Sequence, residues 1–346
     1  MKKFALCCIL LTLQLTNAYA ADNKTSWQRC SEMQSQTSND AELSCYREIA
    51  NQSPPSEKAN TFMAGRAQSL IKEWQPNKSP LVAYKKNYAL LYARRSQVNS
   101  LPYSPNPKNQ VLTPSFVDNR DLKFQFSFKH DLFDLDDWGS IWMGYTQLSF
   151  WQVYDTANSR PFRENNYEPE LIYSLSPELL FPEIELAPSI LNIGFVHHSN
   201  GQSTPRSRSW NRFYLLSGFD LSGKDWGFGK DRKLIVLAKV WGRVREAALD
   251  DDNPDITDFM GNGEIELRYS LDRKWEASII ARKRSVQIDL SASWDAWRLL
   301  TFFDPVDLVD HNTNIHLQYF SGYGENLIDY NHKHHTWGLG LSFPFK

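Results

Sequence analysis

The sequence has few cysteines, no dominant charge and, after its first residues, no long hydrophobic run. Only four of its 346 residues are cysteine, and 38 Lys and Arg face 40 Asp and Glu. This balance argues neither for a nucleic-acid partner nor for a polybasic membrane tether. No later segment has the roughly 18 consecutive apolar residues of a membrane-spanning helix, which excludes a helical membrane protein. The motif Gly-x-Ser-x-Gly is absent, which argues against a soluble α/β-hydrolase.

The N-terminal part divides into two segments. Two lysines precede an apolar run over residues 4–13, and Ala-Tyr-Ala follows at 18–20, so we predict a signal peptide at 1–20. Residues 21–79 are polar, with helix-compatible stretches at 40–51 and 59–74, and we predict a periplasmic extension or plug. This extension carries Cys30 and Cys45, which suit one disulfide in an oxidising compartment; two unpaired thiols are the alternative.

Aromatic residues are abundant and lie largely in short alternating segments. The chain has 12 Trp, 15 Tyr and 20 Phe, and over residues 122–129 leucine and phenylalanine alternate with lysine, glutamine and serine. The same period of two recurs at 264–271, 314–319 and 337–343. A period of two predicts strands with one apolar and one polar face.

The alternating segments are numerous enough to close a barrel. We predict about twelve strands, at 81–96, 121–133, 139–154, 167–177, 187–199, 209–220, 233–245, 261–272, 275–284, 285–294, 312–321 and 334–345. Their number is even, and most have the length that a tilted strand needs to cross a membrane. The predicted fold class is therefore all-β, a transmembrane antiparallel β-barrel over residues 80–346 with a short polar N-terminal extension. A large soluble β-sandwich could have the same composition.

Several connections are expected to be longer than a tight turn. Polar connections at 155–166, 200–208, 246–260 and 322–332 are expected on the outer side of the membrane, while the insertion at 295–311 is harder to place.

One predicted strand places reactive side chains on its apolar face. Side chains two residues apart share a face, so His197 and Ser199 point the same way as Leu191, Ile193 and Phe195. The alternate positions are polar or small and suit a lumen, so we expect the histidine and the serine at the rim of the lipid-facing wall. Polar groups facing lipid are costly enough to indicate a function.

The next predicted strand places Asn211 on the same outer face, and a hairpin through 201–208 brings it close to His197. Serine needs a base to become a good nucleophile, His197 can be that base for Ser199, and Asn211 can hold the imidazole through its side-chain carbonyl. A serine, a histidine and an asparagine in this arrangement predict hydrolysis of an acyl ester, and their outward placement predicts a substrate in the bilayer. Alternatively, the three residues are incidental loop residues, or His197 and His198 bind an adventitious metal.

Two sequence blocks resemble the signature of the outer-membrane phospholipase A family. They are His-His-Ser-Asn-Gly at 197–201 and Ser-Arg-Ser-Trp-Asn-Arg at 207–212. Blocks at 161–169, 251–257 and 321–331 are also similar to that family, and the resemblance covers about residues 80–346.

The resemblance implies a twelve-stranded barrel in the bacterial outer membrane with a lipid-facing His-Ser-Asn site. It implies a calcium-dependent homodimer that hydrolyses either acyl ester of phospholipids and lysophospholipids, with A1 and A2 activity. The implied Ca²⁺ ligands are Ser207, the main-chain carbonyl of Gln202 and the partner's Ser159. Position 202 is usually arginine in the family, but a main-chain ligand tolerates that change.

Three further expectations accompany these assignments. The carboxylates Asp251, Asp252 and Asp255 form a denser acidic cluster, which we expect to be a solvated loop rather than the calcium site. Gln147 lies on an apolar outer face, where the resemblance places it in the dimer contact; contact with lipid headgroups is the alternative. The competing functions are a passive porin-like transport barrel and a structural or adhesive barrel.

Overall fold

The computed structural model describes residues 68–76, 81–175, 177, 187–222, 232–271, 275–293 and 313–343. The chain divides into two compact units, residues 1–64 and 65–346, and every described residue belongs to the second. The predicted signal peptide, Cys30, Cys45, the stretch at 40–51 and the insertion at 295–311 lie outside the described residues.

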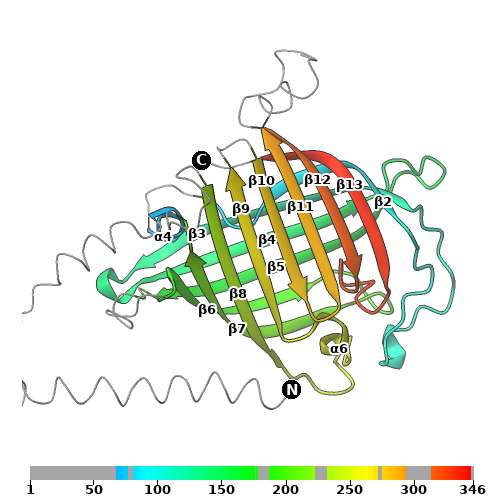
Figure 1. Ribbon diagram of the computed structural model, residues 1–346. Coiled ribbons are helices and arrows are strands. Elements are labelled where there is room, and N and C mark those ends of the chain that lie inside the picture. Colours follow the sequence, from blue (N-terminus) through cyan, green and yellow to red (C-terminus); the bar gives the residue numbers. More distant parts are fainter. Residues whose placement is uncertain are drawn as a thin grey trace, which may run out of the picture. The chain divides into compact units, whose positions relative to one another are not determined.

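The regular secondary structure of the described part of the chain is almost entirely β-strand (Figure 1). Its strands are β1 (Val82–Ala83), β2 (Asn87–Arg95), β3 (Arg120–Asp134), β4 (Ser140–Trp151), β5 (Phe162–Leu175), β6 (Ile190–Ser199), β7 (Ser209–Asp220), β8 (Arg232–Val244), β9 (Gly263–Leu271), β10 (Trp275–Arg282), β11 (Ser285–Ser293), β12 (Asn314–Gly322) and β13 (His334–Phe343). Its helices are α4 (Gln68–Glu73), α6 (Ile256–Met260) and two 3-10 turns, Pro107–Asn109 and Asp136–Trp138. None of these helices is long and apolar enough to cross a membrane.

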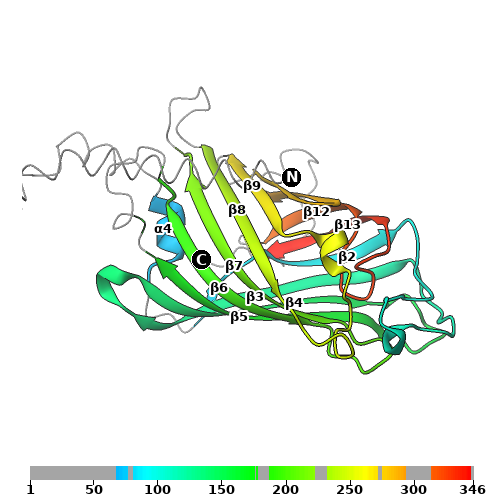
Figure 2. The same ribbon diagram turned by 90° about the horizontal axis from the view of Figure 1, so that it is seen from below.

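The strands close into an antiparallel barrel. Each strand from β2 to β13 pairs with the next along the chain, and β13 pairs back with β2, which leaves no open edge in the ring. The short β1 continues the line of β2 along β3, so the predicted strand at 81–96 is interrupted rather than absent. The prediction of a closed barrel of twelve long strands is confirmed. Figure 2 shows the strands β3 to β7 side by side.

The burial pattern is that of a membrane barrel, with apolar side chains outside and polar side chains inside. On β6, Ile193 is 47% exposed while its neighbour Asn192 is 1% exposed. Lys123 and Lys129 of β3 are almost completely buried, whereas Phe126 between them is 45% exposed. The apolar face of each of these two strands therefore points outward and the polar face points into the lumen, as the alternation in the sequence predicted.

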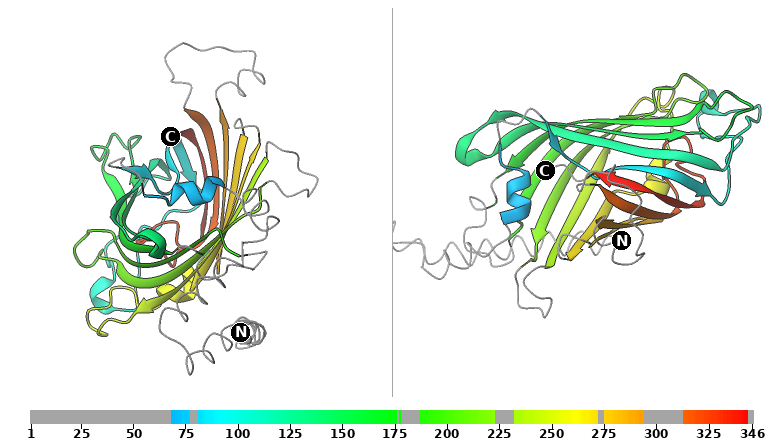
Figure 3. Two further views of the ribbon diagram at one scale, coloured as in Figure 1. Left: turned by 90° about the vertical axis from the view of Figure 1, so that its left-hand side faces the viewer. Right: turned by 90° about the horizontal axis from the view of Figure 1, so that it is seen from above.

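Helix α4 lies within the predicted N-terminal extension and packs inside the ring of strands (Figure 3). Its Leu70 is buried against Ile190 and the backbone of Gly218. Trp74, just after the helix, stacks edge-on to Trp142, and the Lys129 ammonium lies 3.3 Å from its ring centroid. This contact fills part of the lumen with aromatic side chains.

The longer connections share one end of the barrel. The segments that follow β2, β4, β6, β8 and β12 all join an even-numbered strand to the next odd one, so antiparallel pairing brings them to the same end. The predicted loops therefore share one end, as one side of the membrane requires, and their place on the outer side stays a prediction; β5 begins at Phe162 and takes part of the predicted loop at 155–166. Short helix α6 lies in the loop after β8 (Figure 1).

Candidate active site

His197, Ser199 and Asn211 lie on the outer face of the barrel at its long-loop end. All three side chains are half-buried, and the residues next to them on each strand are buried in the lumen. Below them on the same face, Phe195 and Phe213 are exposed and in contact, with ring centroids 5.0 Å apart. The polar cluster therefore stands at the edge of an apolar wall.

The hairpin of β6 and β7 brings two of these residues into direct contact. His197 and Asn211 are paired across the strands, and the distance from His197 Nδ1 to Asn211 Oδ1 is 2.8 Å. Because the amide oxygen can only accept, the bond requires the proton on Nδ1. Nε2 is then the nitrogen left to accept a proton from Ser199, two residues along the same face.

The neighbouring histidine points to the opposite side of the sheet. His198 is buried in the lumen, where Trp210 Nε1 donates to its Nδ1 at 3.1 Å. His197 and His198 therefore cannot hold one metal ion, and the described residues contain no cluster of three His, Cys, Asp or Glu suited to a metal.

The loop that follows Ser199 is held by its own polar side chains. Asn200 Oδ1 accepts from the Arg208 amide at 2.9 Å, and its Nδ2 donates to the Arg206 carbonyl at 2.9 Å. The Arg208 guanidinium is completely buried and donates to the carbonyls of Ser207 and Asn109 at 2.7 and 3.0 Å. These bonds fix the loop between the serine and β7.

The expectation of a solvated acidic loop at 251–255 is wrong. Asp251 is 8% exposed and forms an ion pair with Arg243, and Asp255 accepts a hydrogen bond from the Tyr330 hydroxyl. Asp252 accepts from the hydroxyls of Ser207 and Ser209, at 2.6 and 3.3 Å. A buried carboxylate needs such partners, so the cluster fastens the loop after β8 onto the site.

The predicted calcium ligands lie in two loops at this end. Ser207 and Gln202 belong to the loop between β6 and β7, and no donor in the described part of the chain bonds to the Gln202 carbonyl. Ser159 is exposed in the loop between β4 and β5, with a φ of 59°. A non-glycine residue held in this region is strained, and such strain is common at functional sites.

The blocks singled out in the sequence meet around this site. Glu164, from the block at 161–169, accepts from Gln202 Nε2 at 2.6 Å and from the Ile328 amide at 3.2 Å. Arg163 pairs with Asp329 at 2.7 Å. Segments far apart in the sequence therefore brace one end of the barrel.

The sequence reasoning missed one polar neighbour of the site, Glu246. Asn211 Nδ2 donates to Glu246 Oε1 at 3.0 Å. The strand pattern could have placed Glu246 at this end, because β8 runs beside β7, but only the register shows which side chain it meets.

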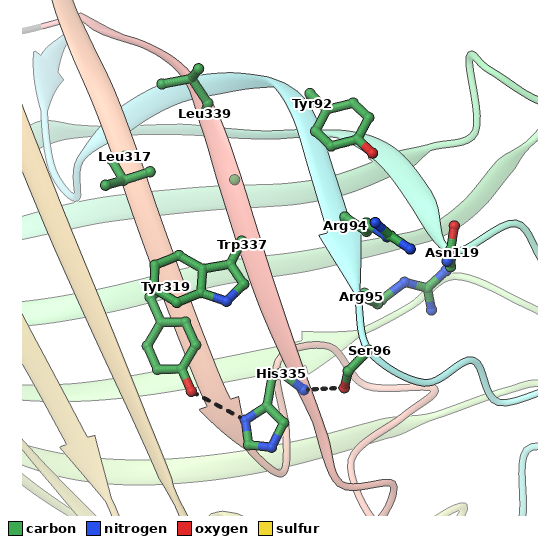
Figure 4. Close-up of a pocket in the computed structure, with 11 residues that line it drawn as sticks. Tyr92, Arg94, Arg95, Ser96, Asn119, Leu317, Tyr319, His335, Trp337 and Leu339 are labelled. Atoms are coloured by element: carbon green, nitrogen blue, oxygen red, sulfur yellow. Dashed lines mark hydrogen bonds between the residues drawn. The ribbon is translucent and has the colours of Figure 1, made fainter.

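A hollow lies on the opposite wall, on β2, β12 and β13 (Figure 4). It has a volume of about 690 Å³, and Arg94, Tyr319, His335 and Trp337 line it. These strands are four to six places from β6 and β7 in the ring, so the hollow is not part of the site. Aromatic and arginine side chains at this level are typical of the membrane–water interface.

The sequence is similar to known phospholipases. Residues 65–343 match the family model described as Phospholipase A1. A putative phospholipase A1 of Neisseria meningitidis is 37% identical over 64% of this chain, but the match spans only 54% of that protein. The phospholipase A1 of Klebsiella pneumoniae is 32% identical over 75% of this chain and 81% of that protein.

Solved structures agree with the sequence relatives. The outer membrane phospholipase of Salmonella typhi, a dimer with bound calcium, gives a TM-score of 0.60 at 27% identity, over 80% of this chain and 97% of that one. An active-site mutant of the Escherichia coli enzyme, with asparagine replaced by alanine, gives a TM-score of 0.61 at 27% identity and the same coverage.

Proposed function

This chain belongs to the phospholipase A1 family of outer-membrane β-barrel enzymes, and we propose that it cleaves phospholipid acyl esters through Ser199, His197 and Asn211. The observation that carries the proposal is the 2.8 Å contact of His197 with Asn211 on the lipid-facing wall, two residues from Ser199. The passive porin is not favoured, because α4 and lumen-facing tryptophans such as Trp142 and Trp210 occupy part of the interior.

The chemistry follows from the two ring nitrogens of His197. As Ser199 Oγ attacks the ester carbonyl carbon, His197 Nε2 takes its proton, and Asn211 Oδ1 stabilises the imidazolium through Nδ1. The proton then passes to the leaving lysophospholipid oxygen as the C–O bond breaks. Water, deprotonated by His197, releases the fatty acid from the acyl-serine. The outward placement of the site selects substrates already in the membrane.

We also propose that this end of the barrel binds Ca²⁺ through Ser207, the Gln202 carbonyl and Ser159 of the partner subunit. Uncharged oxygens beside a carboxylate suit this ion, and the Ser207 hydroxyl lies 2.6 Å from Asp252. When bound, calcium and its water would supply positive charge to stabilise the oxyanion beside the Ser199 amide. The calcium-bound dimer from Salmonella typhi supports this assignment.

Dimerisation is proposed on the same basis. An outer-wall site on one barrel has no pocket for an acyl chain, whereas two such walls facing each other create clefts. Gln147 is half-buried on the outer face of β4, where Tyr145 donates to its oxygen at 3.1 Å and its Nε2 donates to Ser149 at 3.0 Å. The oxygen and the NH₂ group of the Gln147 amide can each form one further hydrogen bond, which a second barrel could supply.

The central test is the release of fatty acid from phospholipid–detergent micelles. Ser199→Ala should lower kcat by about 1000-fold or more, because the nucleophile is lost. The matched control is Ser203→Ala, an exposed serine in the following loop, which should keep full activity. Undiminished release by Ser199→Ala would rule out the proposed mechanism.

A further inference from the structure

The Asn211 side chain bridges two residues rather than one. Its Oδ1 lies 2.8 Å from His197 Nδ1, and its Nδ2 donates to Glu246 Oε1 at 3.0 Å. Glu246 lies in the loop after β8, where Val244 is paired with Asn211 across the strands. Two residues further along the same face, the Glu246 carboxylate can reach the amide.

The orientation of this amide decides which proton His197 carries. An asparagine amide can turn by 180° and exchange its oxygen for its NH₂ group. With the oxygen toward His197, the ring keeps its proton on Nδ1, and Nε2 is free to act as base. With the NH₂ group toward His197, Nδ1 must accept, the proton moves to Nε2, and the ring cannot take the proton of Ser199.

An ionised carboxylate removes this ambiguity, because it can only accept hydrogen bonds. We propose that Glu246 is a positioning residue that fixes the amide of Asn211 and thereby the base tautomer of His197. The inference rests on the proposed Ser-His-Asn function and adds a fourth member to it. Glu246 touches no reacting atom.

The charged neighbours of Glu246 have other partners. Arg243 of β8 pairs with Asp251, and Asp252 accepts from Ser207. Glu246 is half-buried; burial raises the pKa of its carboxyl above the ordinary 4.5, and the hydrogen bond from Asn211 opposes that rise.

The test compares one substitution in two backgrounds. In the otherwise unchanged protein, Glu246→Ala should lower kcat about tenfold with KM unchanged, at saturating calcium, which corresponds to the loss of about one hydrogen bond. Glu246→Gln, which can still accept in one orientation, should lose only about threefold. In the Asn211→Asp background both side-chain atoms at position 211 accept, so orientation no longer matters. There Glu246→Ala should cost nothing, or should raise activity by removing a repulsion.

A second measurement reports on the nucleophile directly. A long-chain fluorophosphonate bonds to Ser199 Oγ through phosphorus as fluoride leaves and the proton passes to His197. Its rate of labelling should fall about tenfold in Glu246→Ala, in step with kcat. The matched control is Asp258→Ala, an exposed acid in the same loop, which should label normally.

The outcomes separate this inference from the function it rests on. An equal tenfold loss in both backgrounds, labelling at the normal rate, or an effect confined to the calcium requirement would each overturn the role of Glu246. Labelling of Ser199→Ala at the normal rate would instead overturn the proposed nucleophile.

Discussion

At the scale of single residues, the site depends on which face of β6 each side chain occupies. His197 and His198 are neighbours in sequence, yet one is half-buried on the outer wall and the other is buried beside Trp210. Successive side chains of a strand point to opposite faces, so one polar residue faces lipid while the next faces the lumen. A polar side chain on the lipid side is costly, which is why we take its presence there as a sign of function.

The contribution of Asn211 can be measured separately. Asn211→Ala should lower kcat by about 10- to 100-fold with little change in KM, because His197 remains but loses its tautomer and orientation. The loss should be smaller than in Ser199→Ala. Asn119→Ala, beside the hollow on the opposite wall, is the control. An Asn211→Ala enzyme with normal kcat would show that another group holds the imidazole.

At the scale of elements, the loops at one end act as a brace for the site. The loop between β6 and β7 is held by Asn109 of the loop between β2 and β3, whose Nδ2 donates to the Ser207 carbonyl at 2.9 Å. The same amide donates to Asp252 at 2.9 Å, so three loops meet in one cluster. Loops positioned by a rigid barrel in this way commonly carry function.

Asp252 is the residue to change in this cluster. Asp252→Ala removes the acceptor of the Ser207 hydroxyl. The calcium concentration for half-maximal activity should rise about tenfold, because a hydrogen bond to a charged group is lost. The only strand residue that bonds to the Asp252 carboxylate in the described part of the chain is Ser209, at the start of β7, so the barrel should keep its heat-modifiable migration in gels. A calcium titration checks the result, with Asp258→Ala as control. An unchanged midpoint would place the calcium site elsewhere.

At the scale of the whole molecule, the proposed calcium site takes Ser159, in the loop after β4, from a second barrel, so under this proposal the dimer is the active form. Cross-linking in detergent should give more dimer with calcium than with a chelator, and activity should follow the dimer fraction. Gln147→Ala should lower that fraction several-fold, while Leu317→Ala on the opposite wall should not. A monomer with full activity would refute the coupling.

The sequence by itself determined the barrel and the faces of its strands. A period of two is a property of the extended backbone, so the alternation in 122–129 and 191–199 fixes which residues face lipid before any long-range contact forms. The strands β6 and β7 follow one another in the chain and pair as a hairpin, which is why the proximity of His197 and Asn211 could also be predicted.

Only the tertiary structure decided what surrounds that pair. The contacts of Asn211 with Glu246 and of Ser207 with Asp252 join residues 35 and 45 positions apart in the sequence. Their meeting depends on the register in which β8 joins β7 and on the path of the loop after β8. This is why the carboxylates at 251–255 were expected in solvent and proved to be buried or half-buried and bonded to neighbouring residues. The periodicity of each strand determines which side chains face lipid, whereas the contacts between loops form only when the closed ring brings the loops together.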